Sequence, residues 1–539
     1  MTRGYVLLIA LFAASGCSGL ILEILWQRQM MLVLGASAPA ITAILTSFFF
    51  GIALGSAIGG RLLARFKSPR SSLRFYAATE AWIGCWALAV PLLLHGSDLI
   101  SQHLLADLNA EGAAALTVRF VLAVLVVLPA TTGMGATIPV MSRLLHTAAT
   151  GAGRAVSIAY GVNAGGAVVG CVLAGFVLMQ SFGIRGALFC AIGLNLCVAM
   201  VALLMAQRAN SEADQSGAAT GRWHIALRGP RGLVLAVYVG SSFCALGLEL
   251  VWFRILAIFN SNGLVTFTTG LATYILGYSI GSLLLYPFVR RRVGSLGVLA
   301  ISCLGAGLAA GLMMTYAQLC QHWIGIGVEQ LIGAIGVSFA AATTREVLNA
   351  AVLMFVPTLF MGMAFPAVCD AVSDAATDIA DSSGQIYFLG NIGGAFGAML
   401  TGLVFIPGIG IRATGFGLAV LLMLFRNFAP SEADTEALGA RRAWLRARTP
   451  EIVAVAVFAA YVLSPISYKW IWPISHRMVP VVALFALGTL AWRRLPWRPA
   501  LLVVPATLLN LWACNVHVDH VTHEHPDPLF SAQHLSEWG

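Results

Sequence analysis

The residues best suited to chemistry in this sequence are two glutamates that lie inside long apolar segments. Glu23 lies in G-L-I-L-E-I-L-W-Q-R, and Glu249 lies in G-L-E-L-V-W-F-R. Ionisable side chains are costly inside a membrane, where they usually face a bundle interior or a cavity and mark a functional site. The sequence therefore predicts that these two carboxyl groups form a site for an ion or a substrate. The alternative is that each glutamate pairs with a nearby arginine and only holds helices together.

The two motifs share their spacing as well as their residue types. A tryptophan follows each glutamate after three residues and an arginine after five, which adds Trp26, Arg28, Trp252 and Arg254 to the candidate site. Three residues are nearly one helical turn, so each tryptophan shares a face with its glutamate. Five residues place each arginine about 140° beyond a full turn, well away from its own glutamate. The partner of each carboxyl group is then expected on another helix, or is the substrate itself.

The composition predicts an all-α integral membrane protein. Hydrophobic residues make up 59 % of the chain, charged residues only 10 %, and the mean hydropathy is +0.87. Apolar runs of roughly 20 residues, the length that crosses a bilayer as a helix, recur along most of the chain. The net charge of +9 comes largely from arginines between these runs, so we expect the lipid bilayer as partner and no nucleic acid. The ten cysteines are scattered and read as small buried hydrophobes.

The chain contains an internal duplication. Four further motifs recur in order in the two halves: G-x-x-x-G-S at Gly51 and Gly277, M-G-x-x-x-P ending at Pro139 and Pro366, N-x-G-G at Asn163 and Asn391, and G-I-R at Gly183 and Gly410. This pattern predicts two pseudo-symmetric six-helix repeats that resemble the major facilitator arrangement, related by a two-fold axis along the membrane normal. Asn163, Asn391 and the intramembrane Glu80 join the candidate substrate- or ion-binding residues.

The duplication and the hydropathy together divide the chain into six parts. We expect a first repeat at 1–206, a cytoplasmic linker at 207–231, a second repeat at 232–428, a cytoplasmic linker at 429–450, about three further hydrophobic helices at 451–515, and a polar tail at 516–539. The loop after the second span carries five basic residues, which places that loop and the N-terminus in the cytoplasm of a bacterial-type inner membrane.

The ordered motifs resemble those of a known family. The duplicated L-E-x-x-W-x-R, the G-x-x-x-G-S span, and the M-G-x-x-x-P and N-x-G-G blocks look like the membrane region of fused major facilitator/spermidine synthase-like proteins. In fused members of that family, a soluble aminopropyltransferase-like domain with a methyltransferase fold follows the membrane region. The polar segments of this chain are each far shorter than a typical domain, and none carries a glycine-rich strand-to-helix motif. We therefore expect no catalytic residues, no cofactor and no aminopropyltransferase activity from this polypeptide by itself.

Two groups of polar residues lie outside the glutamate motifs. The tail places four imidazoles within nine residues, at His517, His520, His523 and His525; this tract either binds a metal ion or is a disordered polar tail. The second repeat carries a series of carboxylates at Asp370, Asp374, Asp378 and Asp381. This series either faces solvent or binds a cationic partner.

Two functions fit these observations. In the first, the chain is a transporter or membrane module that handles a small cationic solute through its intramembrane carboxylates. The resemblance implies that this solute is polyamine-like. Alternatively, as the resemblance implies, it is a non-transporting membrane anchor or partner subunit for a separately encoded aminopropyltransferase-like enzyme of the methyltransferase fold.

We predict that the tail lies on the outer side of the membrane, because the expected spans after the second cytoplasmic linker are odd in number. A Ser531→Cys variant in intact cells should react with a membrane-impermeant thiol reagent. Labelling that occurs only after lysis would mean that an even number of helices precedes the tail.

Overall fold

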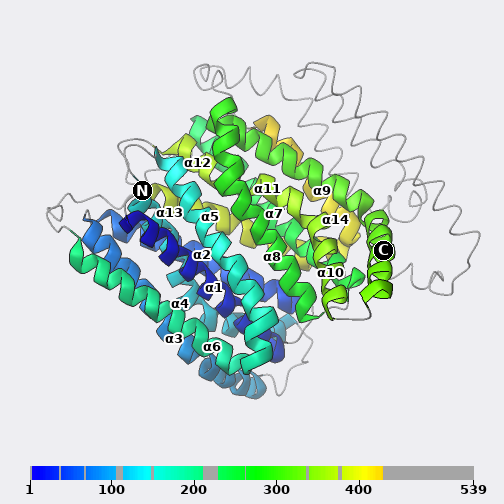
Figure 1. Ribbon diagram of the computed structural model, residues 1–539, viewed down its shortest axis with the longest axis horizontal. Coiled ribbons are helices and arrows are strands. Elements are labelled where there is room, and N and C mark those ends of the chain that lie inside the picture. Colours follow the sequence, from blue (N-terminus) through cyan, green and yellow to red (C-terminus); the bar gives the residue numbers. More distant parts are fainter. Residues whose placement is uncertain are drawn as a thin grey trace, which may run out of the picture. The chain divides into compact units, whose positions relative to one another are not determined.

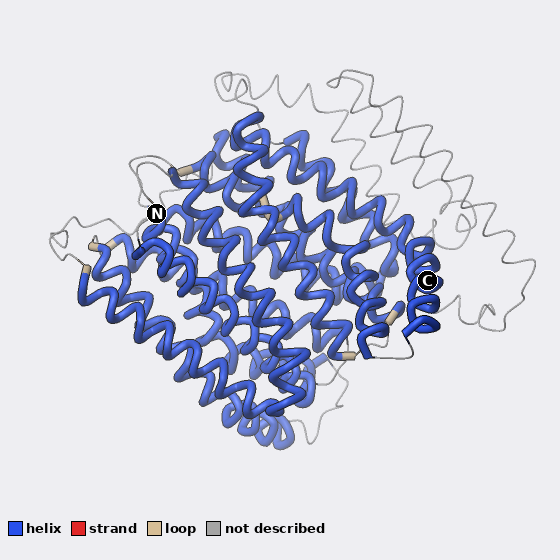
Figure 2. The backbone as a smooth tube through the Cα atoms, in the orientation of Figure 1, coloured by secondary structure: helices blue, strands red, loops and turns tan. Residues whose placement is uncertain are grey.

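The structure, a computed structural model, describes residues 3–34, 38–65, 68–104, 113–146, 151–209, 229–260, 263–335, 339–373 and 379–428. Within these ranges every regular element is a helix, and Figure 2 shows no strand among them. The expected linker at 429–450, the hydrophobic helices at 451–515 and the histidine tail at 516–539 lie outside the described residues, as does most of the linker at 207–231.

The helices follow the order expected from the hydropathy (Figure 1). The first half contains α1 (Arg3–Leu34), α2 (Ala38–Ala64), α3 (Pro69–Leu104), α4 (Ala113–Leu145), α5 (Gly151–Val172), the π-helical segment η1 (Leu173–Leu178) and α6 (Met179–Arg208). The second half contains α7 (Gly229–Phe259), α8 (Leu264–Ile280), η2 (Gly281–Leu285), α9 (Tyr286–Ile335), α10 (Phe339–Ala350), η3 (Ala351–Phe355), α11 (Val356–Met361), α12 (Ala364–Val372), α13 (Ile379–Leu400), η4 (Thr401–Phe405) and α14 (Ile406–Phe428).

The described residues contain nine helical stretches that are long and apolar enough to cross a membrane. Three of these stretches are double, because a glycine with positive φ breaks the helix inside each one, at Gly183, Gly294 and Gly410. Glycine adopts this left-handed region without the steric cost that a Cβ imposes. Each double stretch therefore folds back as two spans, and the two halves have six spans each. The expected all-α membrane fold is confirmed.

The duplication seen in the sequence recurs in the helix contacts. Gly51 of α2 packs against Thr131 of α4, and in the second half Gly277 of α8 packs against Thr358 of α11. One turn further on, Gly55 meets the backbone of Thr132 and Gly281 meets the backbone of Leu359. Glycine allows this close backbone approach between membrane helices. The G-x-x-x-G-S motif thus packs two spans of the same half together in both repeats.

The two halves contact each other through equivalent helix pairs. Helix α2 of the first half packs against α13 of the second, and α5 of the first half packs against α8 of the second. On the α5–α8 side, Ser157 Oγ donates to the Ser282 carbonyl over 2.6 Å, and Ser282 Oγ donates to the Ser157 carbonyl over 3.0 Å. On the α2–α13 side, Gly60 and Gly384 lie against each other's helix. Helix α8 is the second-half counterpart of α2, and α13 is the counterpart of α5. The two contacts are therefore equivalent, as expected for repeats that are related by a two-fold axis.

Part of the acidic series of the second half is engaged within the chain. Asp370 accepts two hydrogen bonds from the Arg290 guanidinium, from Nε over 2.5 Å and from Nη2 over 3.0 Å. Asp381 is buried in the first turn of α13. Asp374 and Asp378 lie outside the described residues. Asp381 therefore does not face solvent, and Asp370 is already paired with a cation of the protein.

We predict that the matched glycines tolerate no side chain. In Gly55→Ala and Gly281→Ala the new Cβ would meet the backbone of Thr132 or Leu359 at less than 3.0 Å, so the helices must separate. Overpacking of this kind costs roughly 1–3 kcal/mol, so both variants should show a lower unfolding temperature in detergent. Gly193→Ala is the control, because a Cβ there meets nothing within 4 Å. Equal unfolding temperatures for all three variants would contradict the packing.

Candidate functional site

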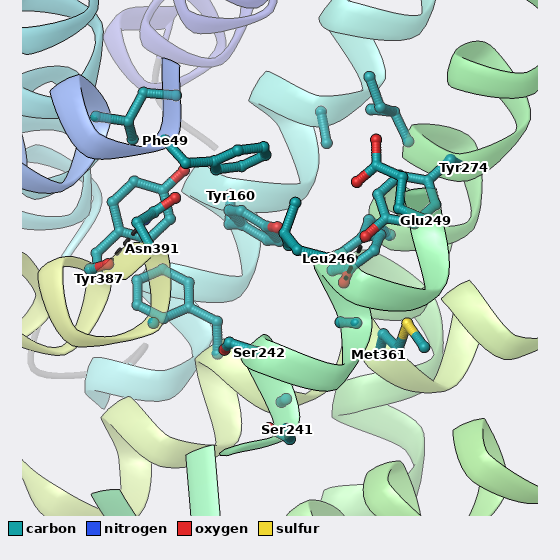
Figure 3. Close-up of a pocket in the computed structure, with 18 of the residues that line it drawn as sticks. Phe49, Tyr160, Ser241, Ser242, Leu246, Glu249, Tyr274, Met361, Tyr387 and Asn391 are labelled. Carbon is teal, nitrogen blue, oxygen red and sulfur yellow. Dashed lines mark hydrogen bonds between the residues drawn. The ribbon is translucent and has the colours of Figure 1, made fainter. Parts of the chain in front are cut away.

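A cavity of about 230 Å³ lies between the two halves and is lined by residues from both. It brings together four of the residues predicted from the sequence. These are Glu23 of α1, Asn163 of α5, Glu249 of α7 and Asn391 of α13. Figure 3 shows Glu249 and Tyr274 on one side of the cavity and Tyr387 and Asn391 on the other. The duplicated motifs therefore meet in one place although they are more than two hundred residues apart in the chain.

The two carboxyl groups of the cavity have no cationic partner in the part of the chain that the structure describes. Glu249 is only 2 % exposed, and its Oε2 is buried without a hydrogen-bond partner. Neither glutamate forms an ion pair with a described residue, and the two lie close enough to each other to interact electrostatically. Two like charges in a low-dielectric site repel, so the site is complete only when protons or a cationic ligand neutralise them.

Tyrosines dominate the rest of the polar lining, and the sequence reasoning missed them. Five of the eleven tyrosines of the chain line the cavity: Tyr160, Tyr238, Tyr274, Tyr278 and Tyr387. The hydroxyl of Tyr274 donates to that of Tyr278 over 3.3 Å, and Tyr160 makes edge contacts with Tyr278 and Tyr387. Tyrosines of membrane proteins usually lie at the membrane–water interface. Tyrosines in the middle of predicted spans could therefore have indicated a polar cavity from the sequence alone.

The two matched asparagines use their amide nitrogens on the backbone. Asn391 Nδ2 donates to the Tyr387 carbonyl over 2.7 Å, and Asn163 Nδ2 donates to the Phe12 carbonyl over 3.4 Å. The side-chain oxygen of each asparagine is then the atom that can accept a hydrogen bond from a ligand. An ammonium group carries only donors, so these oxygens suit it.

The matched tryptophans lie behind the cavity wall. Trp26 and Trp252 are both fully buried and do not line the cavity. Trp26 packs against Phe48 with ring centroids 6.1 Å apart, and Trp252 packs against Tyr274 at 6.4 Å. Phe48 and Tyr274 do line the cavity, and they occupy matched positions on α2 and α8. Each tryptophan therefore supports an aromatic wall residue.

The arginines and Glu80 also lie away from the cavity. Arg28 is exposed and Arg254 is partly buried, and neither is a lining residue. Glu80 of α3 is fully buried against α1, where its Oε1 accepts a hydrogen bond of 2.5 Å from the Ser15 hydroxyl. Next to it, Ser18 donates to Asn195 Oδ1 of α6 over 2.5 Å. Glu80 thus belongs to a polar cluster inside the first half.

A metal site is not apparent in the described ranges. These ranges contain no group of three or more His, Cys, Asp or Glu residues that could hold a metal ion. The four histidines of the tail lie outside them.

Comparisons with known proteins identify the fold. No protein-family model matches the sequence, and no curated protein matches it. A bacterial homologue of the iron transporter ferroportin in its outward-facing state is 12 % identical, with a TM-score of 0.53 over 82 % of this chain and 100 % of that one. The structure of such a homologue with soaked iron gives 12 % identity and a TM-score of 0.51 over the same shares of the two chains. The Major Facilitator Superfamily transporter FucP in the outward conformation is 14 % identical, with a TM-score of 0.47 over 80 % and 99 %.

This likeness shows the fold alone. The described helices share the overall fold of that ferroportin homologue, and the chain is a multi-pass membrane protein.

We predict that Glu80 stabilises the first half rather than binding a ligand in the cavity. Glu80→Ala removes the acceptor of the Ser15 hydroxyl and leaves a void, which together cost roughly 2–4 kcal/mol and should lower the unfolding temperature in detergent. Glu80→Gln keeps an acceptor oxygen of the same shape and should restore most of that loss. An unchanged unfolding temperature for Glu80→Ala would contradict a structural role.

Proposed function

We propose that this protein transports a small organic cation of the polyamine-like class, and that Glu23 and Glu249 hold its charge. One observation carries the proposal: two carboxyl groups from equivalent positions in the two halves line one cavity, and no described cation of the protein neutralises them. A buried charge requires a partner, and a cationic solute supplies one.

The aromatic lining suits the same ligand. An ammonium or substituted ammonium group is attracted to the faces of tyrosine rings within about 6 Å, in addition to its attraction to carboxylates. Five tyrosines line the same cavity as the two glutamates, and their rings can cover the methylene groups of an alkylamine. An anion would be repelled by the two carboxylates, and a neutral sugar, although its hydroxyl groups can donate hydrogen bonds to them, would leave their charge without a counter-charge.

The position of the glutamates also suits a transport cycle. Glu23 is on the first span of one half and Glu249 on the first span of the other, and in transporters built from repeats the substrate binds at the repeat interface near the midplane. Rocking of one half against the other changes the side from which such a site is open. The solute then binds to both halves at once and is released when the two carboxylates separate.

The resemblance to fused major facilitator/spermidine synthase-like proteins supports the polyamine-like class of solute. The five basic residues of the loop after the second span support the proposal that the chain lies in a bacterial-type inner membrane with a cytoplasmic N-terminus. The resemblance further implies a soluble methyltransferase-fold enzyme as a partner. The anchor or partner-subunit alternative rests on the resemblance alone, without an observation at the cavity in its favour.

Uptake by liposomes that contain the purified protein tests the proposal. With putrescine and a panel of other amines as solutes, the wild type should accumulate at least one amine faster than protein-free liposomes. The Glu23→Gln/Glu249→Gln variant should take up that amine no faster than protein-free liposomes, because removing the carboxylates from a desolvated charge pair lowers the binding affinity about a hundredfold or more. Its folded yield should persist, because no cation among the described residues is left unpaired.

The matched control is Glu80→Gln, which also neutralises a fully buried carboxyl group, but outside the cavity. It should transport like the wild type. Full transport by the double variant would overturn the role of the glutamates. A wild type that moves no amine would leave the partner-subunit alternative as the better account.

A further inference from the structure

The cavity is asymmetric although the halves that form it are duplicates. The polar cluster of the first half includes Ser15 on α1, Glu80 on α3 and Asn195 on α6, and Tyr76 lies one turn before Glu80 on α3. The matched positions of the second half are Ser241 on α7, Ser302 and Ala306 on α9, and Leu422 on α14. The offset is 226 residues for the first three positions, as for Glu23 and Glu249, and 227 for the last, as for Gly183 and Gly410.

The matched positions are also similarly buried. Ser15 and Ser241 are each 7 % exposed, and Asn195 and Leu422 are each 1 % exposed. The other two pairs are also buried on both sides. All four positions are therefore buried in both halves.

The two halves fill this place differently. None of the four first-half residues lines the cavity, whereas all four second-half residues do. Serine replaces the large Tyr76 and alanine replaces Glu80, so the second half leaves open the volume that the first half fills with side chains. We call this extension of the cavity the side arm and define it by Ser241, Ser302, Ala306 and Leu422.

The side arm runs along α7 away from the charged site. Ser241, Ala245 and Glu249 follow one another at intervals of four residues on α7, and all three line the cavity. At 1.5 Å per residue, Ser241 lies about 12 Å from Glu249 along the helix axis. Figure 3 shows Ser241 and Glu249 at separate places on the cavity wall.

The side arm offers little to a polar ligand. Ser302 Oγ donates to the Phe360 carbonyl over 2.6 Å, and Ser241 Oγ donates to the Tyr238 carbonyl over 2.8 Å. The hydroxyl protons of both serines are thus used within the protein, and the other two residues are apolar. A second charged group placed here would lose its hydration without a partner.

We propose that the side arm binds the uncharged, apolar end of the transported solute, while Glu23 and Glu249 hold its cationic end. This inference rests on the proposed function and narrows it to amines that carry an apolar substituent at one end. Ser302 and Ala306 determine the specificity, because their small size keeps the side arm open.

Binding of two related amines to the purified full-length protein tests the inference. Putrescine and its N-hexyl derivative carry the same number of amino groups and differ by an alkyl tail. The wild type should bind the N-hexyl derivative at least about tenfold more tightly, which is the gain from burying roughly two methylene groups.

Two variants should remove this preference. Ala306→Leu fills the side arm, and Ser302→Tyr installs the residue that the first half has at the matched position. In both, the affinity ratio between the two amines should fall to about one, while the affinity for putrescine stays near that of the wild type. The ratio is measured within one protein sample, so a lower folded yield does not alter it. Ala300→Leu is the control, because it makes the same change on α9 outside the cavity and should keep the wild-type ratio.

Each outcome separates the two proposals. Equal ratios in the wild type, Ala306→Leu and Ser302→Tyr would overturn the side arm and leave the charged site intact. Loss of binding for both amines in Ala306→Leu, with the protein folded, would also overturn it, because the position would then belong to the charged site. A wild type that binds neither amine would overturn the proposed function and the side arm with it.

Discussion

The free-energy cost of a carboxylate without a partner in a low-dielectric interior is the constraint on which this structure depends. Glu23 and Glu249 lie in the cavity between the halves, and the described part of the chain provides no cation for them. If these groups served only to stabilise the fold, we would expect each to pair with a cation or to be an apolar residue. Replacing buried charged groups by apolar residues is often neutral or favourable for folding stability. The protein instead keeps two acidic groups together, and the surrounding tyrosines suit the cation that their charge requires.

The remaining helices hold this site at the interface between the halves. Glycines at matched positions bring α2 against α4 and α8 against α11, so each half is packed tightly within itself. Between the halves, the α2–α13 and α5–α8 pairs contact through glycines and through serines that bond to backbone carbonyls. Small residues at such interfaces allow close packing of membrane helices. The two halves thus meet at a shared charged site, which is the arrangement that the proposed transport function uses.

Duplication produced the symmetry of the charged site, and divergence changed what surrounds it. Both halves keep the glutamate, the supporting tryptophan and an aromatic wall residue at the same spacing. The interior behind that wall differs, because the first half encloses a hydrogen-bonded cluster around Glu80, whereas the second half has Ser302 and Ala306 in place of Tyr76 and Glu80. A symmetric pair of charges thus lies in an asymmetric cavity, which suits a ligand whose two ends differ.

The sequence by itself determined the membrane class, the order of the spans and the internal repeat, because hydropathy and motif spacing depend on local composition and on the length that crosses a bilayer. It also singled out Glu23, Glu249, Asn163 and Asn391, since polar groups at equivalent places in apolar segments stand out against their neighbours. Only the tertiary structure decided that these four share a cavity, that Trp26 and Trp252 lie behind its wall, and that Glu80 belongs to a separate cluster. It also brought the five tyrosines together from four helices. Such proximity depends on how helices distant in the chain pack and rotate, and the spacing of residues along one helix does not specify the neighbour that each face meets.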